Sequence, residues 1–195
     1  MLIESIPQEK REIIEKSNAL LTGHFLLTSG LHSQYYLQSA LITQTPAFCE
    51  IIANDIASNF KNDNIDVVLA PAVGGIVIGY ELARSLNCKS LFAERQDGKL
   101  TLRRGFSLSP SDKVLLVEDV ITTAGSILEL KEIVDNAGAK TIGFASIFNR
   151  SGGKFQPEEK FYSWQKLIIE TFQPEDCPFC KDGSVAYKPG SRGLK

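Results

Sequence analysis

Two adjacent carboxylates at the end of an apolar run are the residues of this chain best suited to do chemistry. Glu118 and Asp119 follow the apolar residues 114–117, and a segment rich in small and hydroxyl residues, 122–126, comes next. Backbone N–H groups and hydroxyls in such a segment can hold a phosphate, above all where the segment opens a helix. The carboxylates suit sugar hydroxyls or a hard cation such as Mg²⁺. These groups together predict a site for a phosphorylated sugar, and a strand that ends in solvated acids before a capped helix is the simpler alternative.

The elements around this segment alternate between strand and helix. Short apolar runs typical of buried strands lie at 66–70, 90–93, 113–117 and 141–148. Apolar residues at helical spacing predict a helix after Thr45-Pro46, a second through 78–86 and a third through 127–137. Upstream, the pattern predicts a helix over 8–21 and two short strands, 23–28 and 33–37. The alternation favours an α/β fold with a central parallel sheet flanked by helices, and it places functional residues at the C-terminal ends of the strands.

Length and composition limit the class of protein further. The chain has 195 residues, of which 43% are hydrophobic and 23% charged, as in an ordinary single globular domain. Its net charge of -2 makes it a poor general nucleic-acid binder, and no apolar run approaches the length of a membrane span. Four cysteines in a chain of this size do not resemble a disulfide framework, and the first residues lack the apolar core of a signal peptide. We therefore expect a cytoplasmic protein that binds neither nucleic acid nor membrane.

The segment VEDVITTAGS, residues 117–126, resembles the phosphoribosyl-pyrophosphate signature of the type I phosphoribosyltransferases. The resemblance implies that Glu118 and Asp119 hold the ribose hydroxyls and that 122–126 bind the 5-phosphate. A loop at 71–75, PAVGG, is similar in shape to the family's pyrophosphate loop. The donor-binding residues implied outside the acid pair are Val73, Gly74, Val120, Ile121, Thr122, Thr123, Ala124, Gly125 and Ser126.

Three further segments resemble the orotate phosphoribosyltransferase family in particular. Residues 23–36, GHFLLTSGLHSQYY, are similar to the family's N-terminal hood, which implies that Tyr36 flanks the pyrimidine; a hairpin with core aromatics fits the same residues. Residues 92–106 resemble the mobile catalytic loop. The third segment is the C-terminal tail around Cys177 and Cys180.

The segment 92–106 carries four basic and two acidic side chains between positions 94 and 104. The resemblance aligns Arg95 with a pyrophosphate-contacting arginine and Lys99 with the catalytic lysine, next to Asp119 as the third catalytic residue. Gln96 and Thr101 stand where the family has a second lysine and a histidine. A solvated hairpin of mixed charge is the alternative interpretation.

The tail pair Cys177 and Cys180 favours a structural turn, with zinc or redox chemistry as the alternative, since zinc would need two more ligands. His24 and His32 both lie in the expected hood and lack acidic or cysteine partners at ligand spacing in the sequence. The chain also departs from the family at Thr28 and at Gly74, where many members have lysine.

The family resemblance implies the type I phosphoribosyltransferase fold as one domain over 1–195, with a core over about 45–150 and a small hood over about 1–40 plus the C-terminal tail. It implies transfer of a phosphoribosyl group to orotate, bound by Thr122, Arg150 and Tyr36, in pyrimidine (UMP) biosynthesis. It also implies Mg²⁺, held mainly by the substrate near Glu118 and Asp119, and a homodimer that shares the loop across its interface. A phosphoribosyltransferase for another base and a non-catalytic regulator are the alternatives.

Overall fold

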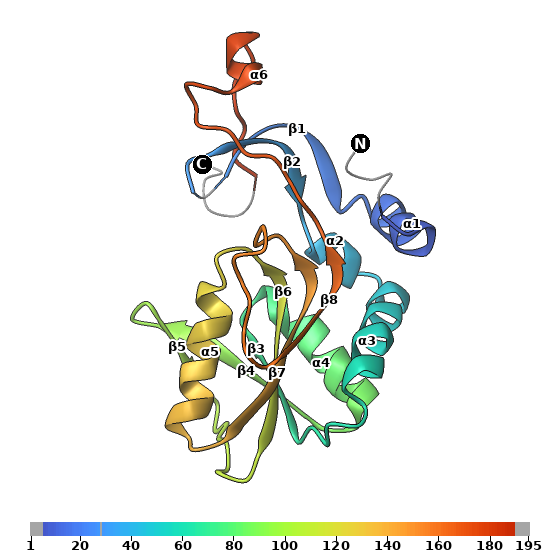
Figure 1. The fold of residues 1–195 in the computed structure, drawn as a ribbon, viewed down its shortest axis with the longest axis vertical. Helices are drawn as coiled ribbons and strands as arrows, with labels where there is room; N and C mark the ends of the chain where they lie inside the picture. The colour runs from blue at the N-terminus through green and yellow to red at the C-terminus, as the bar shows by residue number, and fades with distance from the viewer. Residues whose placement is uncertain (1–5, 28, 190–195) are drawn as a thin grey trace. The chain divides into compact units, whose positions relative to one another are not determined.

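The computed structural model describes residues 6–27 and 29–189, and the chain divides into two compact units (Figure 1). We call Thr43–Leu167 the sheet unit, and Met1–Ile42 with Ile168–Lys195 the small unit. In the described part of the chain, no helix combines the length and apolar character that crossing a bilayer requires. Thr28, one of the departures noted above, lies outside the described residues.

The sheet unit is built on six strands in the order β5-β4-β3-β6-β7-β8. All neighbours are parallel except β4 and β5, which form an antiparallel hairpin at one edge. The strands are β3 (Val67–Pro71), β4 (Lys89–Gln96), β5 (Lys99–Leu102), β6 (Lys113–Ile121), β7 (Lys140–Asn149) and β8 (Lys160–Lys166). The central strands are fully buried because helices cover both faces of a sheet of this kind, and their apolar runs follow from that burial.

Three helices cover this sheet, as Figure 1 shows: α3 (Pro46–Phe60) and α4 (Gly74–Leu86) pack side by side on one face, and α5 (Gly125–Asn136) lies on the other. The α5 face buries Ile127, Leu130 and Val134 against alternate residues of β6 such as Leu116. Thr45 precedes α3 in an extended conformation, and Pro46 opens the helix as predicted. Proline suits this position because the first N–H of a helix has no acceptor within the helix, so its absence costs no hydrogen bond.

The chain reverses its direction of travel across the sheet between β3 and β6. From β3, helix α4 leads outward to β4, whereas from β6, helix α5 leads the opposite way to β7. Loops that leave neighbouring parallel strands in opposite directions open a crevice at the carboxyl ends of those strands. The topology therefore places a binding crevice at the ends of β3 and β6.

The small unit holds helix α1 (Gln8–Ser17), the antiparallel strands β1 (Leu20–Leu26) and β2 (His32–Leu37), and the short helix α6 (Pro178–Lys181). Helix α2 (Ala40–Thr43) lies at the junction between the units. Residues of the C-terminal tail pair with the hairpin through isolated bridges, Phe25 with Tyr187 and His32 with Phe172. The two ends of the chain thus form one structural unit.

The predicted parallel sheet with helices on both faces is confirmed, and each expected strand and helix is present within a few residues. Two strands were not predicted. Residues 99–102 form β5, because Asp97 and Gly98 adopt positive φ and turn the chain back along β4. Residues 160–166 form β8, which extends the sheet beyond the last expected strand.

Candidate active site

Three loops meet at the carboxyl edge of the sheet, where the topology opens its crevice. They follow β3 at Ala72–Val73, β6 at Thr122–Ala124 and β7 at Arg150. The backbone N–H of Arg150 donates a hydrogen bond of 2.8 Å to the carbonyl of Ile121, which ties the ends of β7 and β6 together. The backbone of Arg150 therefore lies beside the start of the loop after β6.

The loop after β6 forms the wall of a small open pocket. Ala124 has a left-handed conformation with φ 63°, and this sharp turn directs the chain into α5 at Gly125. The first N–H groups of a helix have no acceptor within it and carry partial positive charge, so they favour an anion at this end. Residues that line the pocket are Glu118, Val120, Ile121, Thr122, Thr123, Ala124, Gly125, Ser126 and Ile127. The predicted donor-binding residues of this segment, except Asp119, thus line one pocket.

The acid pair at the end of β6 consists of two unlike carboxyl groups. Glu118 is buried, with 9% of its surface exposed, whereas Asp119 is partly exposed. Burial, together with the hydrogen bond and charge of Asp119, raises the pKa of Glu118 to about 9. Without a ligand, Glu118 therefore favours the neutral form at pH 7, in which its O–H can donate a hydrogen bond to Asp119. A cation or a set of sugar hydroxyls at the pair would favour the ionised form.

Helix α4 begins against Asp119. A Cβ atom on Gly74 would lie 2.6 Å from Asp119 Oδ2, far inside van der Waals contact. In its present position, this carboxylate leaves room only for glycine, so the absence of a side chain at Gly74 has a steric reason in this chain. Val73 precedes Gly74 and is 81% exposed at the crevice edge, where the sequence predicts the pyrophosphate loop.

The segment that resembles the catalytic loop is the β4–β5 hairpin, and its arginines form ion pairs. The Arg95 guanidinium donates to both carboxylate oxygens of Glu129 on α5, at 2.9 and 3.1 Å, and also to the carbonyl of Gly98. Glu129 accepts a third bond from the backbone N–H of Leu100. Arg104 makes a similar two-point pair with Glu94. Lys99 is exposed, at the start of β5.

The structure brings most, though not all, of the predicted site residues to one edge of the sheet unit. The acid pair, the 122–126 loop, Gly74 and Arg150 share that edge. Arg95 is instead paired with Glu129 of α5 beside the edge strand β5. Tyr36 belongs to the small unit, where its ring packs against Phe25 at 5.7 Å between centroids.

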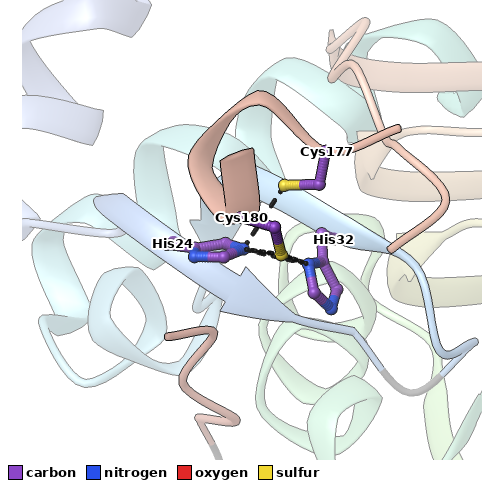
Figure 2. A group of neighbouring side chains, drawn as sticks. All are labelled: His24, His32, Cys177 and Cys180. Carbon is purple, nitrogen blue, oxygen red and sulfur yellow. Dashed lines mark hydrogen bonds between the residues drawn. The ribbon is translucent and has the colours of Figure 1, made fainter. Parts of the chain in front are cut away.

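One group of chemically active residues was missed by sequence reasoning. His24 and His32 do have cysteine partners, because the fold brings Cys177 and Cys180 to them (Figure 2). The histidines and the cysteines are about 150 residues apart in the sequence, so their spacing gave no indication that they meet. The Cys-x-x-Cys spacing of the cysteines was the one indication of such a site.

Comparison with known proteins identifies the family to which this chain, with its fold and candidate site, belongs. A family model described as a phosphoribosyl transferase domain matches residues 39–179. The orotate phosphoribosyltransferase of Caldicellulosiruptor bescii is 50% identical over 181 residues, which cover 93% of this chain and 95% of that protein. The chain therefore belongs to the phosphoribosyltransferase family. Its sequence relatives place it among the orotate phosphoribosyltransferases.

Solved structures confirm the type I phosphoribosyltransferase fold. Orotate phosphoribosyltransferase from Aeropyrum pernix superposes with a TM-score of 0.67 at 20% identity, over 80% of this chain and 92% of that one. Adenine phosphoribosyltransferase from Trypanosoma brucei superposes with a TM-score of 0.65 at 18% identity, over 98% and 90%. Enzymes named for different bases share the fold, so sequence similarity rather than the fold identifies orotate.

Proposed function

We propose that this chain transfers the 5-phosphoribosyl group of phosphoribosyl pyrophosphate to orotate at the carboxyl edge of its sheet, giving orotidine 5′-phosphate and pyrophosphate. The observation that carries the proposal is the pocket at the start of α5 beside the Glu118–Asp119 pair. One end of this pocket suits a phosphate and the other suits sugar hydroxyls. The close similarity to orotate phosphoribosyltransferases supports the choice of base.

Each part of the donor would have its own partners. The N–H groups at the start of α5 and the hydroxyls of Thr122, Thr123 and Ser126 would bind the 5-phosphate, whose charge the helix N-terminus favours. Glu118 and Asp119 would accept hydrogen bonds from the ribose hydroxyls. The exposed residues Val73 and Gly74 would contact the pyrophosphate through their backbone.

Catalysis requires stabilisation of negative charge on the departing pyrophosphate while the anomeric carbon becomes cationic. Lys99 and Arg95 would supply fixed positive charge there. Arg95 is paired with Glu129, so it would have to exchange that carboxylate for the pyrophosphate, with a movement of the β4–β5 hairpin. Closure of such a segment also excludes water, which would otherwise hydrolyse the donor.

Arg150 would bind the orotate carboxylate, since a planar guanidinium grips a carboxylate through two parallel hydrogen bonds. Thr122, whose backbone follows the Ile121 carbonyl that Arg150 binds, would be its companion. Tyr36 would flank the pyrimidine ring, as the family resemblance implies.

The acid pair also fits Mg²⁺, because carboxylate oxygens are the hard ligands that this ion prefers. When bound with the donor, Mg²⁺ would neutralise charge on the pyrophosphate. Glu118 and Asp119 would lie near the ion while the substrate supplies most of its ligands. Activity should therefore be lost in excess chelator and restored by added Mg²⁺, and full activity in chelator would refute this requirement.

The reaction itself is tested by following orotate absorbance with and without phosphoribosyl pyrophosphate. We expect consumption only when the donor is present, and no consumption of adenine under the same conditions. Consumption of adenine without consumption of orotate would assign the chain to another base. Absence of any transfer, with donor binding retained, would favour a regulator.

We also propose a homodimer in which the hairpin of one chain serves the site of its partner. Mixing Lys99→Ala chains with Asp119→Asn chains should then restore activity, since some dimers would contain one site free of both substitutions. No recovered activity after demonstrated subunit exchange would count against a shared site.

A further inference from the structure

Four side chains of the small unit, none of them among the predicted site residues, converge on one point. His24 comes from β1, His32 from the neighbouring strand β2, and Cys177 and Cys180 from the first turn of α6, as Figure 2 shows. One ligand atom from each residue lies within 4.8 Å of the other three. Three of the four residues are buried and Cys180 is half-buried. We propose that this group, the His₂Cys₂ cluster, binds one structural Zn²⁺ ion.

Three of the six distances between ligand atoms in the cluster match the size of a zinc site, and all six are at most 4.8 Å. With Zn–N near 2.0–2.1 Å and Zn–S near 2.3 Å, a tetrahedral ion holds its ligand atoms roughly 3.3 to 3.8 Å apart. Cys177 Sγ lies 3.4 Å from His24 Nε2, and Cys180 Sγ lies 3.8 Å from the same nitrogen and 3.3 Å from His32 Nδ1. The two histidine nitrogens are 2.9 Å apart and need only a small separation to admit the ion.

The ligand types select zinc and a structural role. Two imidazoles and two thiolates form one of the closed four-ligand sets of structural zinc, and they leave no open position for a substrate. Two thiolates also balance the double positive charge of the ion, which suits a buried site.

Backbone contacts hold both histidines in place independently of their rings. The His24 carbonyl accepts a hydrogen bond of 2.8 Å from the Tyr187 N–H, and His32 exchanges two backbone bonds of 2.9 Å with Phe172. The Nδ1 atom of His24 lies 3.1 Å from Ser184 Oγ, which leaves Nε2 to face the cysteines. A hydrogen bond to the second ring nitrogen is the usual way in which a protein orients a metal-binding histidine.

The ion would join the two ends of the chain. His24 and Cys177 are 153 residues apart, and apart from backbone pairing few buried apolar residues connect the tail with the hairpin. Units with a small core commonly depend on a metal or a disulfide for their stability. The proposed zinc would therefore stabilise the small unit, including the segment that resembles the hood.

Metal content of the full-length protein tests the proposal directly. Protein purified under reducing, chelator-free conditions should hold about one zinc ion per chain by elemental analysis. Cys180→Ser should lose most of this zinc. Cys88→Ala is the matched control, since this half-buried cysteine lies outside the cluster, and it should retain the full amount.

Two further measurements do not depend on the folding of a ligand variant. Co²⁺ added to reduced, metal-free protein should give the intense visible bands and thiolate charge transfer of a tetrahedral His₂Cys₂ site. Ser184→Ala, a change at an exposed position, should weaken zinc binding by about tenfold because it removes the partner of His24 Nδ1.

Removal of zinc should also lower the unfolding midpoint, and added zinc should restore it. Reduced protein that binds neither Zn²⁺ nor Co²⁺ would overturn the proposal. So would equal zinc loss in the Cys88 and Cys180 variants. A Cys177–Cys180 disulfide in protein whose reduced form binds no metal would instead assign a redox pair.

Discussion

Replacing Gly74 with alanine tests whether the close approach of α4 to the acid pair belongs to the active site. The new Cβ atom would lie 2.6 Å from Asp119 Oδ2, 2.8 Å from Cγ and 2.9 Å from Oδ1. Ordinary contact requires about 3.4 Å, so the carboxylate must move by roughly 0.8 Å. Asp119 is a short, partly exposed side chain and can rotate away, so we expect little loss of stability.

The loss of activity should be much larger than the loss of stability. A misplacement near 1 Å in a catalytic group can reduce the rate by about a hundredfold. We therefore expect Gly74→Ala to lower kcat/KM for phosphoribosyl pyrophosphate by about 10- to 100-fold, equivalent to roughly 1.4–2.7 kcal/mol of transition-state stabilisation. The unfolding midpoint should stay close to that of the wild type, since alanine also favours the helix.

Gly79→Ala is the matched control in the same helix. Its Cβ atom would lie 2.9 Å from the Cβ of Ala70 and 3.4 Å from Val117 Cγ1, in the packed interface between α4 and the sheet. Overpacking of this kind costs about 1–3 kcal/mol of stability. We expect this variant to lose thermal stability and to keep its kcat/KM. A kcat/KM of Gly74→Ala within about twofold of the wild type would refute a catalytic role for this contact, as would losses of activity in proportion to stability in both variants.

Three further substitutions separate the roles proposed for the other site residues. Lys99→Ala should lower kcat strongly without a change in unfolding midpoint, because an exposed lysine supports little packing; steady-state kinetics with an unchanged kcat would exclude its catalytic role. Arg150→Ala should raise KM for orotate by at least about tenfold, or roughly 1.4 kcal/mol, with little effect on the donor, whereas the opposite pattern would move Arg150 to the phosphate side. Glu118→Gln should abolish donor binding and also flatten the dependence of stability on pH. Because the pKa of Glu118 is raised to about 9, the folded state holds one more proton than the unfolded state between about pH 4.5 and 9, so wild-type stability falls as pH rises through this window. In denaturant unfolding of ligand-free protein from pH 5 to 8, the free energy of unfolding of the variant should therefore rise relative to that of the wild type. Parallel changes of the two free energies with pH would contradict the raised pKa of Glu118.

The segment proposed to bind the donor could be picked out from the sequence because all of its information is local. Residues 117–126 are consecutive, and the end of the strand, the acid pair and the hydroxyl-rich turn follow one another along the chain. The parallel sheet was readable for the same reason, since burial on both faces leaves near-continuous apolar runs. Strand β8 escaped because its residues, KFYSWQK, mix charged and aromatic side chains at a half-buried edge of the sheet.

Tertiary structure alone decided what depends on two segments meeting. The sequence shows Gly74 as a missing lysine, whereas the fold shows that Asp119 occupies the space of a side chain there. The sequence indicates only that Arg95 is a basic residue in a loop-like segment, whereas the fold pairs it with Glu129, 34 residues away. The burial that raises the pKa of Glu118 likewise comes from packing around the end of β6.

The His₂Cys₂ cluster gives the clearest case of this division. Each half is an ordinary local pattern: two histidines in a hairpin, and two cysteines at the first turn of a short helix. Neither half can bind zinc by itself, because two ligands do not complete a tetrahedral site. The pairing of the C-terminal tail with β1 and β2 brings the halves together across 153 residues. Sequence spacing records neighbours along the chain, and a site whose ligands come from both ends of the chain exists only once the chain has folded.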